Sequence, residues 1–130
     1  MREILFRGKP LGKLDEEFVY GSLGVISTDL VAIYQCEEYY EDIKTLVDIG
    51  TVGQYTGLTD KNGKKIFEGD IVECNGGFYQ IVFEDGCFGA YQDEHYFFTL
   101  FSLYVAVEVI GNIHDNPELL KEDNKCEKEE

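Results

Sequence analysis

The sequence predicts a mainly β fold. Antiparallel strands are expected to form a small SH3-like barrel or rolled sheet, with an N-terminal small β-subdomain and a short C-terminal helix. Turn signals recur about every ten residues between positions 53 and 113, a spacing typical of small barrels. The 130 residues include nine Phe, nine Tyr and 14 Gly but only 2 Pro. This composition suits strands joined by tight turns.

Residues 1–48 are expected to form the N-terminal β-hairpin subdomain. Residues 3–6 are a short apolar strand candidate, and alternation over 18–23 predicts another strand. A turn at 27–29 separates two further apolar runs, which is the pattern of a hairpin. Residues 37–47 fit an acidic loop followed by a strand. A short helix is the alternative, because apolar residues recur there at helical spacing.

Residues 49–121 are expected to form the barrel core, organised around residues 53–72, here called the signature stretch. Asn62-Gly63 favours a type I′ turn, in which both central residues have positive φ. Asp60 can also close an Asx-turn by bonding to the backbone two residues on. Gly69 is expected to take a backbone conformation unfavourable for other residues. Asp70 is expected to accept backbone N–H bonds at that corner.

The chain after the signature stretch contains further turn signals. Asn75-Gly76 marks a second tight hairpin, and residues 84–86 mark the next turn. Residues 96–103 and 105–113 are strand candidates. Pro117 suits the first turn of a helix, which is expected to extend to about residue 121. Residues 122–130 have almost no apolar content and are expected to be an acidic, disordered tail.

The formal net charge of −15 limits the classes of partner that the chain can bind. An acidic chain repels nucleic acid unless a local basic patch reverses the field, and the main candidate patch is Arg2, Arg7, Lys9 and Lys13. Nucleic acid is therefore an unlikely partner on charge grounds. The acidic surface instead favours solubility, basic protein partners, or mimicry of a nucleic-acid backbone. Homo-oligomerisation is compatible with this view, because exposed strand edges must be covered.

The four cysteines, at 36, 74, 87 and 126, show no CxxC spacing, and the first residues lack the apolar run of a secretory signal. Free thiols in a reducing cytoplasm are expected. Cys74 and Cys87 could face each other across a hairpin, although two small, partly buried side chains is the preferred interpretation. The sequence has no apolar run long enough to cross a bilayer.

No catalytic, cofactor-binding or metal-binding residue is predicted. The stretch after Asp60 lacks the glycine and glutamate of a calcium loop, and no catalytic motif occurs elsewhere. An enzyme or nucleic-acid-processing accessory is the alternative. Its site would be built from scattered residues: Asp70, Glu73, Glu108 and His114. An aromatic set near acidic residues could be a protein-binding face or an oligomer interface: Tyr39, Tyr40, Tyr91, Tyr96, Phe97 and Phe98. The alternative is ordinary core, which is expected to account for at least half of the set.

Several segments resemble the YopX-like proteins of temperate phages and prophages. Residues 51–72, TVGQYTGLTDKNGKKIFEGDIV, are similar to the core signature of that family. Residues 18–21, FVYG, resemble its early aromatic-x-Tyr-Gly element, with Phe18 in place of Trp. Residues 109–119, VIGNIHDNPEL, resemble its closing segment, and residues 4–9 fit its opening. The resemblance implies a β-rich fold and no established activity. The resulting expectation is a small, non-catalytic interaction or accessory protein that binds a host or phage protein in the bacterial cytoplasm.

Overall fold

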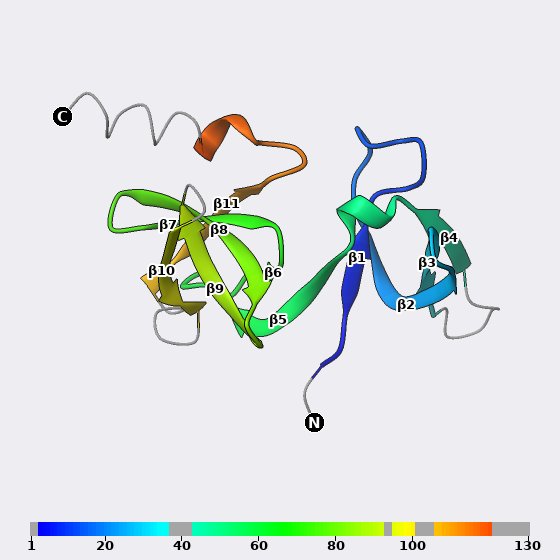
Figure 1. The fold of residues 1–130 in the computed structure, drawn as a ribbon, viewed down its shortest axis with the longest axis horizontal. Coiled ribbons are helices and arrows are strands. Elements are labelled where there is room, and N and C mark those ends of the chain that lie inside the picture. Colours follow the sequence, from blue (N-terminus) through cyan, green and yellow to red (C-terminus); the bar gives the residue numbers. More distant parts are fainter. Residues whose placement is uncertain (1–2, 37–42, 93–94, 101–105, 121–130) are drawn as a thin grey trace. The chain divides into compact units, whose positions relative to one another are not determined.

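A computed structural model describes residues 3–36, 43–92, 95–100 and 106–120 of the chain. The chain divides into two compact units, Met1–Tyr55 (unit 1) and Thr56–Glu130 (unit 2). Both are built from antiparallel strands, with a short helical segment at residues 118–120 (Figure 1). The predicted fold class is confirmed: the protein has a curled, half-barrel sheet, a second sheet and a short C-terminal helix.

Unit 1 contains four strands, a 3₁₀ turn and the start of a fifth strand. In chain order these are β1 (Phe6–Gly8), β2 (Val19–Ser27), β3 (Leu30–Gln35), β4 (Ile43–Val47), η1 (Ile49–Thr51) and β5 (Gly53–Thr59). They are ordered β4-β3-β2-β1-β5 in the sheet. The hairpin predicted around residues 27–29 is confirmed, because β2 and β3 pair on either side of it. Its register shifts between Val25 and Ser27.

The sheet of unit 1 curls because the chain after β1 also pairs with β4. Pro10 bridges to Val47, and the N–H of Leu11 donates to the carbonyl of Leu46 at 2.9 Å. The N–H of Asp48 donates to the carbonyl of Lys9 at 2.8 Å. The inner face buries Val31, Ile33 and Val47, with Phe6, Val19, Leu23 and Val52 packed against them.

Unit 2 contains a five-stranded sheet ordered β10-β9-β8-β7-β11. Its strands are β6 (Lys65–Phe67), which pairs with β5, and then β7 (Asp70–Cys74), β8 (Gly77–Glu84), β9 (Cys87–Gln92), β10 (His95–Thr99) and β11 (Glu108–Asn112). The consecutive antiparallel strands β7, β8 and β9 form the middle of this sheet, and β11 lies at one edge.

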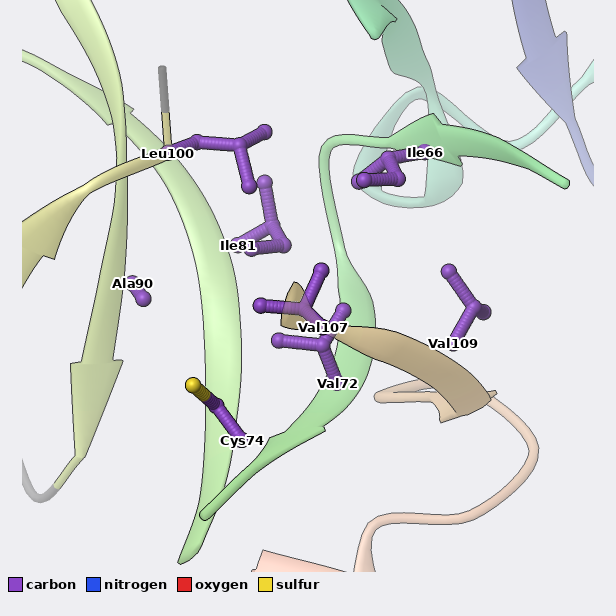
Figure 2. Close-up of a cluster of buried hydrophobic side chains, with 8 residues drawn as sticks. All are labelled: Ile66, Val72, Cys74, Ile81, Ala90, Leu100, Val107 and Val109. Atoms are coloured by element: carbon purple, nitrogen blue, oxygen red, sulfur yellow. The ribbon is translucent and has the colours of Figure 1, made fainter. Parts of the chain in front are cut away.

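The core of unit 2 lies on one face of this sheet (Figure 2). Tyr79 lies opposite Val72, and Ile81 lies opposite Ala90, so the four side chains share one face. The buried cluster also includes Cys74 of β7 and Val109 of β11, together with three residues outside the strands of this sheet: Ile66, Leu100 and Val107. Because alternate residues of a strand face opposite sides, Glu73 and Glu108 lie on the other face.

The glycine-containing turns follow the predicted pattern at one site and depart from it at another. Asn75 and Gly76 both have positive φ, 52° and 85°, as a type I′ turn requires. At Asn62-Gly63 only the glycine has positive φ, 84°, so the type I′ prediction there is wrong. The Asp60 side chain instead sets the shape of that turn, through the bonds described below.

The other local predictions have mixed outcomes. The strand favoured for the end of 37–47 is confirmed at β4, while residues 37–42, including Tyr39 and Tyr40, lie outside the described residues. The sequence placed a domain boundary after residue 48, and the structural division falls within β5. The expected tail, residues 122–130, also lies outside the described residues. No helix in the described segments is long and apolar enough to span a membrane.

Candidate functional site

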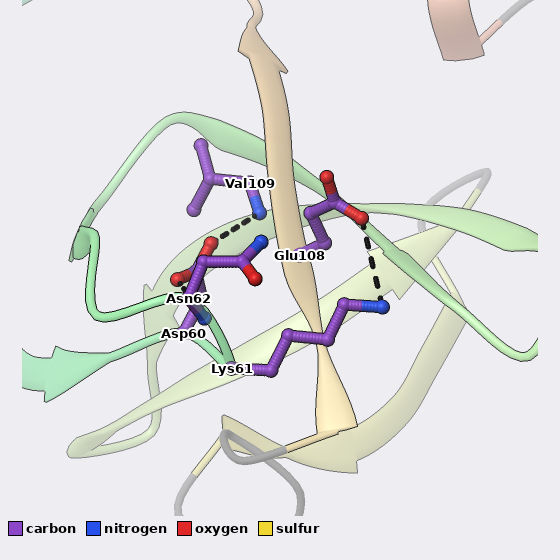
Figure 3. A network of polar contacts seen from close by, with 5 residues as sticks. All are labelled: Asp60, Lys61, Asn62, Glu108 and Val109. Carbon is purple, nitrogen blue, oxygen red and sulfur yellow. Dashed lines mark hydrogen bonds and ion pairs between the residues drawn. The ribbon is translucent and has the colours of Figure 1, made fainter.

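The signature stretch contains the most densely bonded polar group of unit 2, the turn at Asp60. The carboxylate Oδ1 of Asp60 accepts the N–H of Asn62 at 2.9 Å (Figure 3). The same oxygen accepts the N–H of Lys64, also at 2.9 Å. The backbone of Asp60 donates to the carbonyl of Lys64 and accepts from Gly63. The predicted Asx-turn is therefore confirmed, and the side chain at its centre is only 6% exposed.

The same turn covers the outer edge of β11. The second carboxylate oxygen, Oδ2 of Asp60, accepts the N–H of Val109 at 2.9 Å, and the N–H of Lys61 donates to the carbonyl of Val107 at 3.1 Å. These are the bonds that a neighbouring strand would supply. We call this arrangement the edge cap. It protects an edge strand that would otherwise offer unpaired backbone groups to another chain.

The electrostatics of the cap fix the charge of Asp60. Burial raises the pKa of its carboxyl. The hydrogen bonds from the N–H groups of Val109, Lys64 and Asn62, with the charge of Lys64, together lower this pKa by more than burial raises it. The net pKa lies below the ordinary value of 3.8. Asp60 is thus an ionised acceptor with both oxygens engaged by the backbone. It is unsuited to proton transfer, because a general base needs a pKa near the working pH.

Asp70 has a similar structural role at the second corner of the signature stretch. Its Oδ2 accepts the N–H of Phe67 at 2.8 Å, and the residue is 2% exposed. Gly69 has φ 93°, as predicted for this corner. Its N–H donates to the carbonyl of Ile81, and its carbonyl accepts the N–H of Ile113. The corner therefore ties the signature stretch to two later segments.

Of the four residues proposed for a scattered site, the structure brings two together. Glu73 and Glu108 are directly opposite each other on β7 and β11. Like charges at such a position are destabilising, and the Lys61 ammonium offsets part of this, with its Nζ 3.6 Å from Oε1 of Glu108. Both side chains of that ion pair are substantially exposed, so the pair contributes little stability.

The other two members do not join this pair. Asp70 is three positions before Glu73 on the same strand, so the two side chains leave opposite faces of the sheet. His114 lies in the turn after β11, where its backbone N–H donates to Oδ1 of Asn112 at 2.9 Å. Within the described residues, no three His, Cys, Asp or Glu side chains form a group that could hold a metal ion.

The basic patch of unit 1 is largely turned inward. Arg7 is 5% and Lys9 is 1% exposed. The guanidinium carbon of Arg7 lies 4.2 Å from the centre of the Phe18 ring, and Nζ of Lys9 lies 4.7 Å from it. Nζ of Lys9 also donates to the carbonyl of Glu16. Lys13 is exposed, and Arg2 lies outside the described residues.

Known proteins that match the chain agree with this architecture. The family described as YopX protein matches residues 24–121. The chain belongs to the YopX family. A solved structure, the crystal structure of protein EF1440 from Enterococcus faecalis, is similar to it with a TM-score of 0.59 and 25% identity. The similarity covers 92% of this chain and 99% of that one. No curated protein matches the chain.

The residues that match the YopX family include both parts of the edge cap, the turn and the strand edge that it covers. Residues 24–121 contain Asp60 and Lys61 as well as their partners Val107 and Val109. The sequence indicated the turn and the closing segment separately and did not indicate that they meet. The contacts of Arg7 and Lys9 with the Phe18 ring were not predicted either. Their only signal in the sequence is that Arg7, in β1, and Lys9, directly after β1, are two positions apart ahead of an aromatic residue.

The cysteines of this YopX protein do not form the pair that was considered. Cys74 lies opposite Gly77 at one end of β8, and Cys87 lies opposite Glu84 at the other end. Both are free thiols, and only Cys74 is buried. Cys36 is also free and exposed. Cys74 and Cys87 therefore do not face each other across the hairpin, and the prediction that both are partly buried is wrong, because Cys74 is buried and Cys87 is exposed.

Proposed function

We propose that this YopX-family chain is a non-catalytic protein-interaction or accessory module, encoded by a phage or prophage and acting in the bacterial cytoplasm. The observation that carries the proposal is the engagement of Asp60 and Asp70 by the backbone. These two buried aspartates of the signature stretch stabilise the fold by accepting hydrogen bonds from the backbone. An enzyme site needs a base or nucleophile directed at a substrate, and these two carboxylates accept backbone N–H groups.

The distribution of apolar surface supports an interaction role. Among the described residues, exposed large apolar side chains are concentrated in unit 1, and Phe83 is the exception in unit 2. The unit 1 set is Ile4, Leu11, Leu14, Tyr20, Val25, Ile26, Ile43, Leu46 and Ile49. Concentrated apolar surface on a small unit is typical of a protein-binding region.

The alternative is an enzyme or nucleic-acid-processing accessory. The Glu73–Glu108 pair favours it, because two facing carboxylates are a common starting point for binding a divalent cation. Nucleic-acid binding has less support, since two of the four cations of the basic patch are buried. Self-association is compatible with the interaction role and is measured directly by sedimentation.

Affinity capture of the tagged full-length chain from host cells, read by quantitative mass spectrometry, tests the proposal. The matched variant is Glu73→Gln/Glu108→Gln, which removes the carboxylate pair and keeps side-chain size. We expect a reproducible partner that both proteins retain equally. Absence of any reproducible partner would contradict the proposal. Loss of a metal-dependent activity in the variant would establish the alternative.

A further inference from the structure

We propose that unit 1 carries a docking surface for a cationic, amphipathic segment of another protein, centred on Leu11 and Leu46. The inference rests on the proposed function, since it specifies the chemistry of the partner that the interaction module binds. Three features carry it: a pair of exposed leucines held side by side, an acidic surrounding, and a buried cluster that fixes the loop contributing one of the leucines.

The two leucines are cross-strand neighbours. Pro10 bridges to Val47, and the N–H of Leu11 donates to the carbonyl of Leu46 at 2.9 Å. Opposite residues of an antiparallel pair share a face. Val47 is buried in the core, whereas Leu11 is 50% and Leu46 is 38% exposed. Leu14 and Ile49, each three positions further along its own segment, are also about half exposed.

The charge on the surface of unit 1 selects the kind of partner. Among its described charged residues that are not buried, acidic residues outnumber lysines by six to two, an excess of 6 − 2 = 4 negative charges, whereas Arg7 and Lys9 are buried. The lysines are Lys13 and Lys44, and the acidic residues are Glu3, Asp15, Glu16, Glu17, Asp29 and Asp48. A cationic apolar segment complements this surface. Nucleic acid, an anionic membrane or a second copy of this −15 chain would meet repulsion.

The surface is organised before binding. Nζ of Lys9 lies over the Phe18 ring at 4.7 Å and donates to the carbonyl of Glu16. The carbonyl of Lys9 accepts the N–H of Asp48 at 2.8 Å. One buried lysine therefore ties the loop that carries Leu11 both to Phe18 and to the end of β4. A surface held in this way loses less conformational entropy on binding.

The test uses the full chain and a synthetic amphipathic helix of Leu and Lys, with a Leu/Glu counterpart and an apolar-free Lys/Ser peptide as probes. Calorimetry gives affinity, and amide NMR shifts give location. We expect the Leu/Lys peptide to bind, with shifts concentrated in residues 9–17 and 44–50. Leu11→Ser/Leu46→Ser should weaken binding by about tenfold or more, the usual effect of losing central apolar contacts.

Two matched controls have exposed apolar side chains elsewhere, Val25→Ser at the β2–β3 hairpin and Phe83→Ser in unit 2. Both should bind the Leu/Lys peptide as the parent chain does. A second variant, Glu16→Lys/Glu17→Lys, should weaken binding independently of the leucines. Retained amide dispersion in each variant shows that the fold is intact.

Equal affinity for the Lys/Ser or Leu/Glu peptide would overturn the inference, and so would equal weakening by the Val25 or Phe83 substitution. A dimer that Leu11→Ser/Leu46→Ser dissociates would identify a second copy as the occupant and also overturn it. Reproducible capture of a partner without Leu/Lys binding would remove this inference and leave the proposed function standing. Leu/Lys binding without any captured partner would remove the proposed function.

Discussion

Oδ2 of Asp60 accepts the backbone N–H of Val109 at 2.9 Å, across 49 positions of sequence. The carboxylate thereby does for β11 what the carbonyl of a neighbouring strand would do. The N–H of Lys61 supplies the second bond, to the carbonyl of Val107. The signature stretch is accordingly a folding element that closes the edge of a sheet, and Asp60 is part of the backbone bonding pattern.

Asp60→Asn should destabilise the protein by about 2 kcal/mol. The amide group places N–H donors against backbone N–H donors, and leaving a buried donor without an acceptor costs about 1–3 kcal/mol. Urea unfolding followed by circular dichroism measures the change. Asp29→Asn is the matched control, because it removes the same charge at an exposed turn and should change stability by less than about 0.5 kcal/mol. Equal effects of the two substitutions would contradict the cap.

Acid should weaken the protein through Asp60. Burial raises its pKa, the backbone N–H groups lower it more, and the folded pKa lies below 3.8. The unfolded chain therefore binds the proton more readily, so this contribution is present above about pH 4 and is lost as pH falls through the folded pKa. The unfolding free energy of the parent chain should fall more steeply below pH 4 than that of Asp60→Asn. Parallel curves would exclude this linkage.

Gly21→Ala should destabilise the protein by about 1–3 kcal/mol, the usual cost of overpacking. An added Cβ would lie 2.2 Å from the carbonyl oxygen of Tyr34 on the paired strand, and backbone cannot move aside as a flexible side chain can. Thermal unfolding measures the loss. Ser22→Ala is the control, because Ser22 is the next residue of β2 and is exposed. A Gly21→Ala protein as stable as Ser22→Ala would show that β2 and β3 adjust freely.

Glu84→Gln should lower the pKa of Tyr91. Burial, the hydrogen bond to Glu84 and the charges of Glu84 and Asp85 raise that pKa from 10.0 to about 12. Glu84→Gln removes the charge of Glu84 and replaces a charge-assisted hydrogen bond by a weaker neutral one, so the phenol should ionise at lower pH. NMR of ring-labelled tyrosine measures the midpoint, with the Tyr91 signal assigned by Tyr91→Phe. An unchanged midpoint in Glu84→Gln, or an equal shift in the exposed control Glu118→Gln, would contradict the contact.

Local chemistry explains which parts of the fold could be predicted from the sequence. The Asx-turn at Asp60, the positive φ of Gly69 and the Asn75-Gly76 hairpin all depend on residues within five positions of one another. The conformation of Asn62 was predicted incorrectly, because Asp60 bonds to the N–H groups of Asn62 and Lys64 and sets the turn. Side-chain bonding to the backbone therefore decided this turn more than the Asn-Gly dipeptide did.

The candidate site could not be predicted because it depends on register and burial. Glu73 and Glu108 meet only through the pairing of β7 with β11, whose register shifts between Val109 and Gly111. Such a shift leaves no mark in the spacing of residues. Arg7 and Lys9 were expected at the surface, since charged residues are almost never fully buried unless they are paired. The Phe18 ring and the Glu16 carbonyl provide that pairing.

The Gly69 corner takes its donor and its acceptor from the chain that follows it, Ile113 and Ile81. On the ribosome the signature stretch emerges before either partner has been made. The two hydrogen bonds of Gly69 can therefore both form only after the closing segment has left the exit tunnel. Nascent chains that stall ahead of Ile113 would hold an incomplete corner, which makes translation through the last part of the gene a condition for this protein to reach its native state.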